Sequence, residues 1–356
     1  MLIALAWGAA AAHAAQRITV EQLKQLLAQQ QTAHASDEEA AAQLGLVELS
    51  ERLATAALER LKAEFKPGEK TAKQLDVLAD VSAFLEPPAR ELPRMDPPSA
   101  EAQQEMLRAA TSFATVTLKH LPDFLATRMT WSLEDIPVLT ADTSAQSGMH
   151  LVGRSSSEVA YRGGLEFASK NAAAAGSART MRVPNLSSAG EFGPVLATVM
   201  TDSAQGKIAW SHWEQTAEGV AGVFRYEVPE QAAHYTIDFC CGWDSESGDE
   251  KSYHGRPAYH GTITVNPKTG EILRVTVETD LDVFDPVLHF GLVVEYGRVE
   301  INGSSLVCPV RSAVIFRAVM VERKRSWDVI HVNDATFSDY RRFGSTARIV
   351  SNAAAR

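Results

Sequence analysis

The segment VAGVFRYEV, residues 220–228, decides the fold class of this chain. Phe224 and Tyr226 fall on one face of an extended segment, whereas Arg225 and Glu227 fall on the other. Successive side chains of a β-strand point to opposite faces, so this period of two is typical of a strand with one buried face and one solvated face. The segment therefore predicts a half-buried strand rather than a helix.

The same alternation recurs in neighbouring segments. Residues 235–241 and 273–278 repeat the period of two. Residues 266–270 (NPKTG) and the pair Asn302-Gly303 separate further runs of this kind, and such residues tolerate the positive φ angles that tight hairpin turns require. We therefore expect a meander of antiparallel strands in the second half of the chain.

Residues 15–86 carry three helix-start signals. Each is a hydroxyl residue three positions before an acid or amide, which is the spacing of a capping box. The three pairs are Thr19 with Gln22, Ser36 with Glu39, and Thr71 with Gln74. Leucines then recur at steps of three or four and predict helices with one apolar stripe. The stripes either pack against one another or form a partner-binding face.

Prolines concentrated in residues 87–99 predict an extended linker, because proline cannot continue a helix. Residues 100–356 then form the predicted β domain. A sheet with one apolar face must have that face covered, and predicted helices at 99–120 and 189–200 supply the cover. The predicted fold class is α+β, with an N-terminal helical segment followed by a curved antiparallel sheet, half-barrel-like, under helices.

The most distinctive short motif is GEFG at residues 190–193. Ser188 and Glu191 have capping-box spacing, so Glu191 is expected to cap the helix at 189–200. The alternative is that Glu191 presents a carboxylate at the mouth of the β domain.

Trp210 and Trp213 lie in a predicted strand at 207–213, where alternation places their side chains on opposite faces.

The first residues, MLIALAWGAAAAHAA, indicate export. This apolar stretch is shorter than the roughly 20 residues that span a bilayer, and Ala12-His13-Ala14 matches the A-x-A cleavage pattern. We predict a signal peptide at residues 1–14, with a buried N-terminal helix as the alternative. No later segment is apolar enough to cross a membrane, so we expect a periplasmic or secreted protein without a transmembrane helix in its mature chain.

Charge and motifs narrow the class of function. The formal net charge of -10 argues against nucleic acid as a partner, since such binding requires clustered basic residues. The ten histidines show no H-x-x-x-H or other metal-ligand spacing, and the chain contains neither a G-x-S-x-G elbow nor a phosphate-binding loop. We therefore expect no metal, no cofactor and no catalytic residues. A hydrolase with a dispersed site is the alternative, because triads are defined by geometry.

The three cysteines are expected to form one disulfide in an oxidising compartment. Strand parity places Cys241 and Cys308 on the apolar side of the sheet, so Cys241–Cys308 is the favoured pair. Cys240–Cys308 is the alternative, and three buried thiols are a further one.

Five segments together resemble a large family of exported bacterial proteins to which no activity is assigned. They are LPDFLATR at 121–128, SSAGEFGPVL at 187–196, AYHGTITVNPKTGEILRV at 258–275, VEYGRVEINGSSLVCPVRS at 294–312, and NDATFSDYRRFG at 333–344. More distantly, the strand-rich part is similar to the half-barrel of periplasmic lipoprotein carriers. That resemblance implies a curved sheet that wraps covering helices and encloses an apolar cavity.

The half-barrel resemblance implies a non-catalytic function: binding an apolar ligand, a lipid, or a lipidated or other envelope protein. The candidate ligand-binding face shares one strand parity and consists of Phe224, Tyr226, Tyr235, Ile237 and Phe239. If the helices cover this face completely, the aromatic side chains are ordinary core. If the cover is partial, the remaining concavity suits an acyl chain. An extracytoplasmic hydrolase and an envelope scaffold are two different functions that the sequence also allows.

Overall fold

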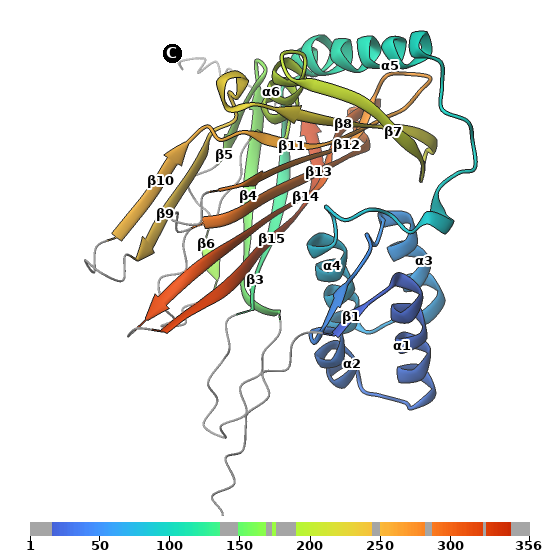
Figure 1. Ribbon diagram of the computed structural model, residues 1–356, viewed down its shortest axis with the longest axis vertical. Helices are drawn as coiled ribbons and strands as arrows, with labels where there is room; N and C mark the ends of the chain where they lie inside the picture. The colour runs from blue at the N-terminus through green and yellow to red at the C-terminus, as the bar shows by residue number, and fades with distance from the viewer. Residues whose placement is uncertain are drawn as a thin grey trace, which may run out of the picture. The chain divides into compact units, whose positions relative to one another are not determined.

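The computed structural model describes residues 16–135, 149–168, 173–175, 190–243, 250–281, 287–322 and 325–342 (Figure 1). The chain divides into two compact units. The first comprises Met1–Pro88 and Pro137–Met149, and the second comprises Ala89–Ile136 and His150–Arg356. Each unit has its own apolar core, and each is described by itself.

Within residues 16–88, the described part of the first unit, the chain forms four α-helices and one pair of short strands. The helices are α1 (Val20–Thr32), α2 (Asp37–Leu44), α3 (Thr55–Phe65) and α4 (Glu69–Val81), and the strands are β1 (Gln16–Ile18) and β2 (Val47–Leu49). The two strands pair in parallel. Three-residue strands are too short to show a period in the sequence, so the mixed character of this unit was not predicted. The leucine stripes pack against one another, with Leu23, Leu58 and Leu75 almost fully buried.

Two of the three predicted capping boxes are confirmed, at Thr19 and at Ser36. The prediction for Thr71 is wrong, because α4 already begins at Glu69. The backbone amides of Lys70 and Thr71 instead donate to the two carboxylate oxygens of Asp37, each at 3.0 Å. A carboxylate from the neighbouring helix α2 thus satisfies the free amides at the start of α4.

The second unit is built on an 11-stranded sheet with the order β5-β4-β3-β15-β14-β13-β12-β11-β8-β7, in which β6 also pairs with β4. All of its pairings are antiparallel, and the two ends of the sheet do not pair with each other. The strands are β3 (Phe124–Glu134), β4 (His150–Arg162), β5 (Leu165–Ala168), β6 (Ala173–Ala175), β7 (Lys207–Thr216), β8 (Gly219–Val228), β11 (Tyr259–Val265), β12 (Ile272–Asp280), β13 (Val287–Ile301), β14 (Ser304–Glu322) and β15 (Arg325–Arg342). The large antiparallel sheet that the alternating pattern predicts is therefore present.

Both predicted hairpin turns are confirmed. The turn at residues 266–270 joins β11 to β12, and the turn at Asn302-Gly303 joins β13 to β14. Asn302 and Gly303 adopt φ angles of 52° and 78°, the left-handed conformations that an Asn-Gly turn supplies.

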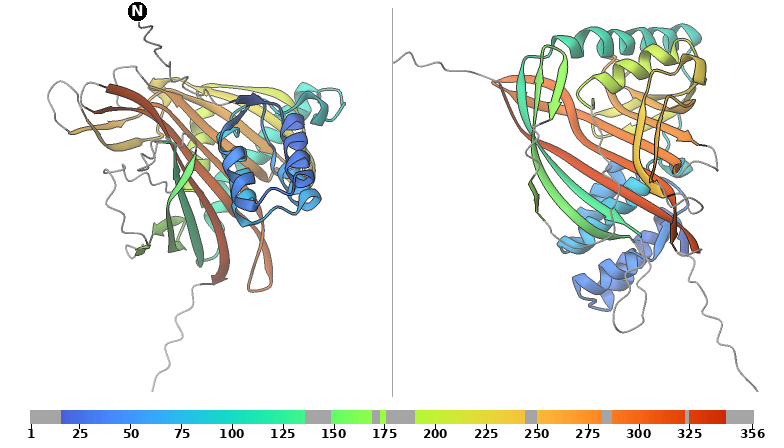
Figure 2. Two further views of the ribbon diagram at one scale, coloured as in Figure 1. Left: turned by 90° about the horizontal axis from the view of Figure 1, so that it is seen from below. Right: turned by 90° about the vertical axis from the view of Figure 1, so that its left-hand side faces the viewer.

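Helices α5 (Ala100–Ser112) and α6 (Pro194–Ser203) lie on the same side of the sheet (Figure 2). A π-helical turn, η2 (Phe113–Thr117), and a short 3₁₀ turn, η3 (Leu118–His120), continue α5. Two other 3₁₀ turns are η1 (Ala89–Glu91) and η4 (Glu230–Ala232). Side chains from both helices and from the sheet form one core. A large sheet with helices on its apolar face is the predicted arrangement of this part of the chain.

The start of α6 differs from the prediction. The helix begins at Pro194 and its N-cap is Gly193, so Glu191 precedes the helix and does not cap it. Ser188, the other half of the expected capping box, lies outside the described residues. The Glu191 side chain is fully buried rather than at a mouth. Proline at the first helical position favours this later start, because its fixed φ suits a helix and no amide is lost.

Two strand predictions also need correction. A β-bulge between Trp210 and His212 shifts the alternation of β7, so the two tryptophan rings lie together with their centroids 4.7 Å apart. Strand β9 (Ile237–Trp243) does not join the sheet beside β8. It pairs with β10 (Glu250–Gly255) in a separate two-stranded sheet, and β8 pairs with β7 and β11.

Candidate functional site

Most of the predicted aromatic face is closed core. Phe224, Tyr226 and Ile237 are 0%, 1% and 6% exposed. The Phe224 ring contacts Trp210 edge-on with centroids 5.4 Å apart. The buried Tyr226 hydroxyl donates to the backbone oxygen of Thr276 at 2.6 Å, which satisfies its polar atom inside the core.

Tyr235 and Phe239 are the remaining members of that face. Tyr235 is half-buried, and its ring packs at 5.8 Å from Tyr259 and 6.0 Å from Phe290. The side chain of Phe239 lies outside the described residues. The four described side chains therefore pack within or against the core beneath the helices, and ligand binding by this face stays a prediction.

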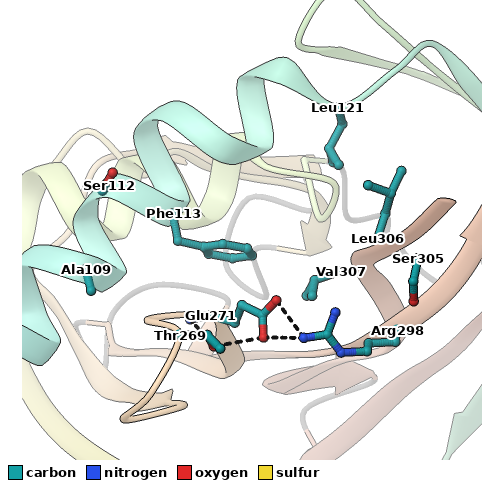
Figure 3. Close-up of a pocket in the computed structure, with 10 residues that line it drawn as sticks. All are labelled: Ala109, Ser112, Phe113, Leu121, Thr269, Glu271, Arg298, Ser305, Leu306 and Val307. Carbon is teal, nitrogen blue, oxygen red and sulfur yellow. Dashed lines mark hydrogen bonds and ion pairs between the residues drawn. The ribbon is translucent and has the colours of Figure 1, made fainter.

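A cavity of about 370 Å³ opens elsewhere in the same unit, between the C-terminal part of α5 and two hairpins (Figure 3). It is lined by Ala109, Ser112, Phe113, Leu121, Thr269, Glu271, Arg298, Ser305, Leu306 and Val307. Its size falls within the range of small-molecule sites, and its lining combines apolar side chains with a few polar groups, as such sites do.

The apolar part of the cavity wall comes from three places in the chain. Phe113 begins the π-helical turn after α5, Leu121 follows η3, and Leu306 lies on β14. In Figure 3 the Phe113 ring and the side chains of Leu121 and Leu306 face the same space. A π-turn widens a helix locally and is frequent at functional sites, which makes this end of α5 a suitable wall for a ligand.

An ion pair forms the polar part of the wall. Nη2 of Arg298 lies 2.8 Å and 2.7 Å from the two carboxylate oxygens of Glu271. The Thr269 hydroxyl donates to Glu271 Oε2 at 2.8 Å, so it orients the carboxylate. The Arg298 side chain is 46% exposed and that of Glu271 is 17% exposed. The cavity thus ends in a charge pair that is neutral as a whole and partly in water.

Glycine at position 270 brings the β11–β12 hairpin against α5. Gly270 has φ +74°, and a Cβ built on it would lie 2.4 Å from Cβ of Ala109. Real Cβ atoms do not approach this closely, so only glycine permits the contact. The hairpin motif was visible in the sequence, but its contact with a helix some 160 positions away in the chain was not.

Cys308 is buried and free in this structure. Burial raises the pKa of its thiol to about 12, so the thiol stays protonated at neutral pH. The side chains of Cys240 and Cys241 lie outside the described residues. The predicted link Cys241–Cys308 and its alternative Cys240–Cys308 therefore stay predictions, which non-reducing peptide mapping tests.

Catalytic and metal-binding clusters are the other kinds of site that side chains could form. Among the described residues, no group of three or more His, Cys, Asp or Glu side chains is arranged to hold a metal ion. On β7 the Ser211 hydroxyl lies 2.9 Å from Nδ1 of His212, but Nε2 of His212 is 3.7 Å from Glu214. That distance exceeds hydrogen-bond reach, and the three residues lie outside the cavity wall.

Comparison with known proteins gives one distant likeness. A scan of protein families finds no match, and a search of curated proteins finds no significant one. Among solved structures the chain is similar to a LolA superfamily protein from Nitrosomonas europaea, with 9% sequence identity and a TM-score of 0.22. The match covers 68% of this chain and 93% of the other. It does not place the chain in the exported bacterial family, and no ligand is inferred from it.

The described helices include none that is long and apolar enough to cross a bilayer. Residues 1–15, which carry the predicted signal peptide, lie outside the described residues.

Proposed function

We propose that this protein binds an apolar or amphipathic ligand of the acyl-chain class in the cavity beside α5, and that it does so outside the cytoplasm. The observation that carries the proposal is the cavity of about 370 Å³, with Phe113, Leu121 and Leu306 at its apolar part and the Arg298–Glu271 pair at its polar part. The location outside the cytoplasm rests on the apolar segment at residues 1–15.

The lining favours an acyl chain over a charged metabolite. Burying one methylene group contributes about 0.8 kcal/mol, so a chain of several methylenes gains affinity from the apolar wall alone. Arg298 carries the positive charge at the wall, and Glu271 already neutralises it at 2.7 Å. A strongly anionic metabolite would have to displace that carboxylate. An acyl chain gains most of its affinity from the apolar wall, and its polar end can stay in the water beside the partly exposed ion pair without displacing Glu271.

Two sources of an acyl chain fit this chemistry: a free lipid, or the lipid group of an envelope protein. Native mass spectrometry of protein purified from its own envelope distinguishes them, because a co-purifying lipid and a co-purifying protein differ in mass. N-terminal sequencing of the same material tests export, and a chain that begins near Gln16 supports signal-peptide removal.

The direct test measures displacement of a fluorescent fatty acid. Replacement of Leu306 by Trp enlarges a wall residue and fills the cavity, so binding should weaken at least tenfold while the fold persists. The matched control is Leu165→Trp on the edge strand β5, where the side chain is 59% exposed and outside the cavity. Undiminished binding by Leu306→Trp, or no binding by the unaltered protein, would contradict the proposal.

A further inference from the structure

A tryptophan on β7 holds a proline-containing segment of the same chain. The segment is Asp96-Pro97-Pro98, which precedes α5 and forms neither helix nor strand. The indole Nε1–H of Trp213 donates to the backbone oxygen of Asp96 at 2.8 Å, across 117 positions of the chain. Tertiary structure, and not a local turn, therefore places this segment against the end of the sheet.

A second side chain bonds the same segment. Nε2 of Gln103, on α5, donates to the backbone oxygen of Pro98 at 2.8 Å. Pro97 and Pro98 have no backbone N–H, so the segment offers carbonyl acceptors and needs partners that donate. The Trp213 indole and the Gln103 amide both donate. The hydrogen-bonding groups of the site thus match those of a Pro-Pro segment.

The backbone of the segment is extended before it binds. Proline fixes φ near about −65°, and the residue before a proline is driven to extended conformations. Asp96 and Pro97 each precede a proline. Such a segment loses little conformational freedom on binding, and aromatic side chains that receive extended proline-rich peptides are a recurring mode of recognition.

The aromatic surface of the site is built into the fold. The rings of Trp210 and Trp213 are half-buried, pack against the core and meet at 69°. A Cβ built on Gly222 of β8 would lie 2.9 Å from the Trp210 ring, so glycine lets this ring lie close to the sheet. The two rings are therefore held in place before the segment meets them.

The bound segment, in contrast, lies at the surface. Asp96 and Pro97 are exposed, and Pro98 is half-buried. The next residue, Ser99, is the N-cap of α5, and its hydroxyl accepts from the amide of Ala102 at 3.3 Å. The segment can thus leave the site without opening the core, and while it is bound it fastens the start of α5 to β7.

We propose that Trp210, Trp213 and Gln103 form a binding site for an extended Pro-Pro segment of a polypeptide, and that residues 96–98 occupy it as a strap on the start of α5. The site is separate from the cavity at the C-terminal part of α5 and does not depend on ligand binding there. Because the strap is tethered, its local concentration is high, and a free peptide must compete with it.

The first test is limited trypsin digestion of the full-length protein. Arg94 is exposed, and cleavage after it requires the adjoining strap to leave the site. Trp213→Phe keeps a ring but lacks the indole N–H, so this cleavage should be about three- to tenfold faster. Gln215→Ala is the control, because this exposed amide on the same strand donates to Thr216, and cleavage should not change.

A double-mutant cycle shows whether the prolines and Trp213 act together. Pro97→Ala with Pro98→Ala should also speed cleavage after Arg94. When these changes are combined with Trp213→Phe, the combined variant should be cleaved no faster than the faster of its two parents, because both changes remove one interaction. Rate increases that multiply in the combined variant would overturn the proposal.

Competition by a free peptide tests the site in the unaltered protein, whatever the stability of the variants. Tethered segments have effective concentrations in the millimolar range, so the peptide MDPPS (residues 95–99) at about 10 mM should speed cleavage after Arg94 about twofold or more. The same peptide with alanine at both proline positions should not. Equal effects of the two peptides, or no acceleration by either, would contradict a proline-directed site.

Discussion

Phe224 is a residue whose burial distinguishes a role in the core from a role in ligand binding. The sequence shows only that Phe224 lies on the same strand face as the other residues of the predicted ligand-binding face. The structure adds full burial and an edge contact with Trp210. Phe224 does not line the cavity. Its replacement should therefore lower the stability of the protein and leave ligand binding in the cavity unchanged.

We therefore expect Phe224→Ala to lower the free energy of unfolding by about 3 to 5 kcal/mol, the usual cost of deleting a buried phenyl ring. Uptake of a fluorescent fatty acid, measured where the variant is still folded, should be unchanged. Chemical denaturation gives the first quantity and a fluorescence titration gives the second. Weakened uptake with little loss of stability would instead support the predicted ligand-binding role of Phe224.

Glu271 supports a prediction about ligand charge. It neutralises Arg298, and the pair is partly exposed, so water screens their attraction. Replacement of Glu271 by Gln should free the guanidinium and strengthen binding of a fatty acid by about two- to fivefold.

Binding of the matching fatty alcohol, which has no carboxylate, is the internal control for Glu271→Gln. Its affinity should stay the same, because only the charge at the cavity wall changes. Equal gains for acid and alcohol would mean that the substitution altered the shape of the cavity rather than its charge.

At the scale of elements, two hairpins use glycine for different reasons. Gly270 and Gly303 have nearly the same φ, +74° and +78°. A Cβ at Gly270 would collide with Ala109 of α5, whereas a Cβ at Gly303 would meet nothing within 4 Å. Gly270 therefore permits a close contact between the first hairpin and a helix, whereas Gly303 serves only the turn of the second hairpin.

This pair permits a controlled measurement. Gly303→Ala should cost about 1 to 2 kcal/mol, the penalty for a left-handed backbone alone. Gly270→Ala should cost about 1 to 3 kcal/mol more, because the added methyl group is forced against α5. Gly270→Ala should also weaken fatty-acid binding. Equal destabilisation by the two substitutions in thermal unfolding would show that the hairpin does not press on the helix.

At the scale of the whole molecule, the buried residues form two separate apolar cores. One is confined to residues 18–79, and the other draws on residues from Met106 to Phe337. Separate cores allow separate cooperative transitions, since each unit buries its own apolar surface.

We expect calorimetry to resolve two transitions. Leu58→Ala, at a fully buried position of the first core, should lower one of them through a loss of about 2 to 5 kcal/mol and leave the other in place. Phe224→Ala should do the reverse. A single transition that both substitutions shift equally would mean that the two units unfold together.

The sequence alone determined the features that depend on near neighbours in the chain. The capping boxes at Thr19 and Ser36 require residues three positions apart, and the Asn302-Gly303 turn requires two residues that tolerate positive φ. Strand alternation needs only a period of two. Interactions of this range are complete within a few residues, so the antiparallel sheet and the starts of two helices could be predicted.

Only the tertiary structure decided which of these elements meet. Glu191 has capping-box spacing, yet its side chain is buried in the interior beside Arg128. A β-bulge places the rings of Trp210 and Trp213 in contact, and β9 pairs with β10 outside the main sheet. The cavity brings together α5, the hairpin at Gly270 and the β13–β14 hairpin, three segments that no local rule connects to one another. Each outcome depends on packing between residues far apart in the chain, because burial and repulsion act through space and not along the sequence.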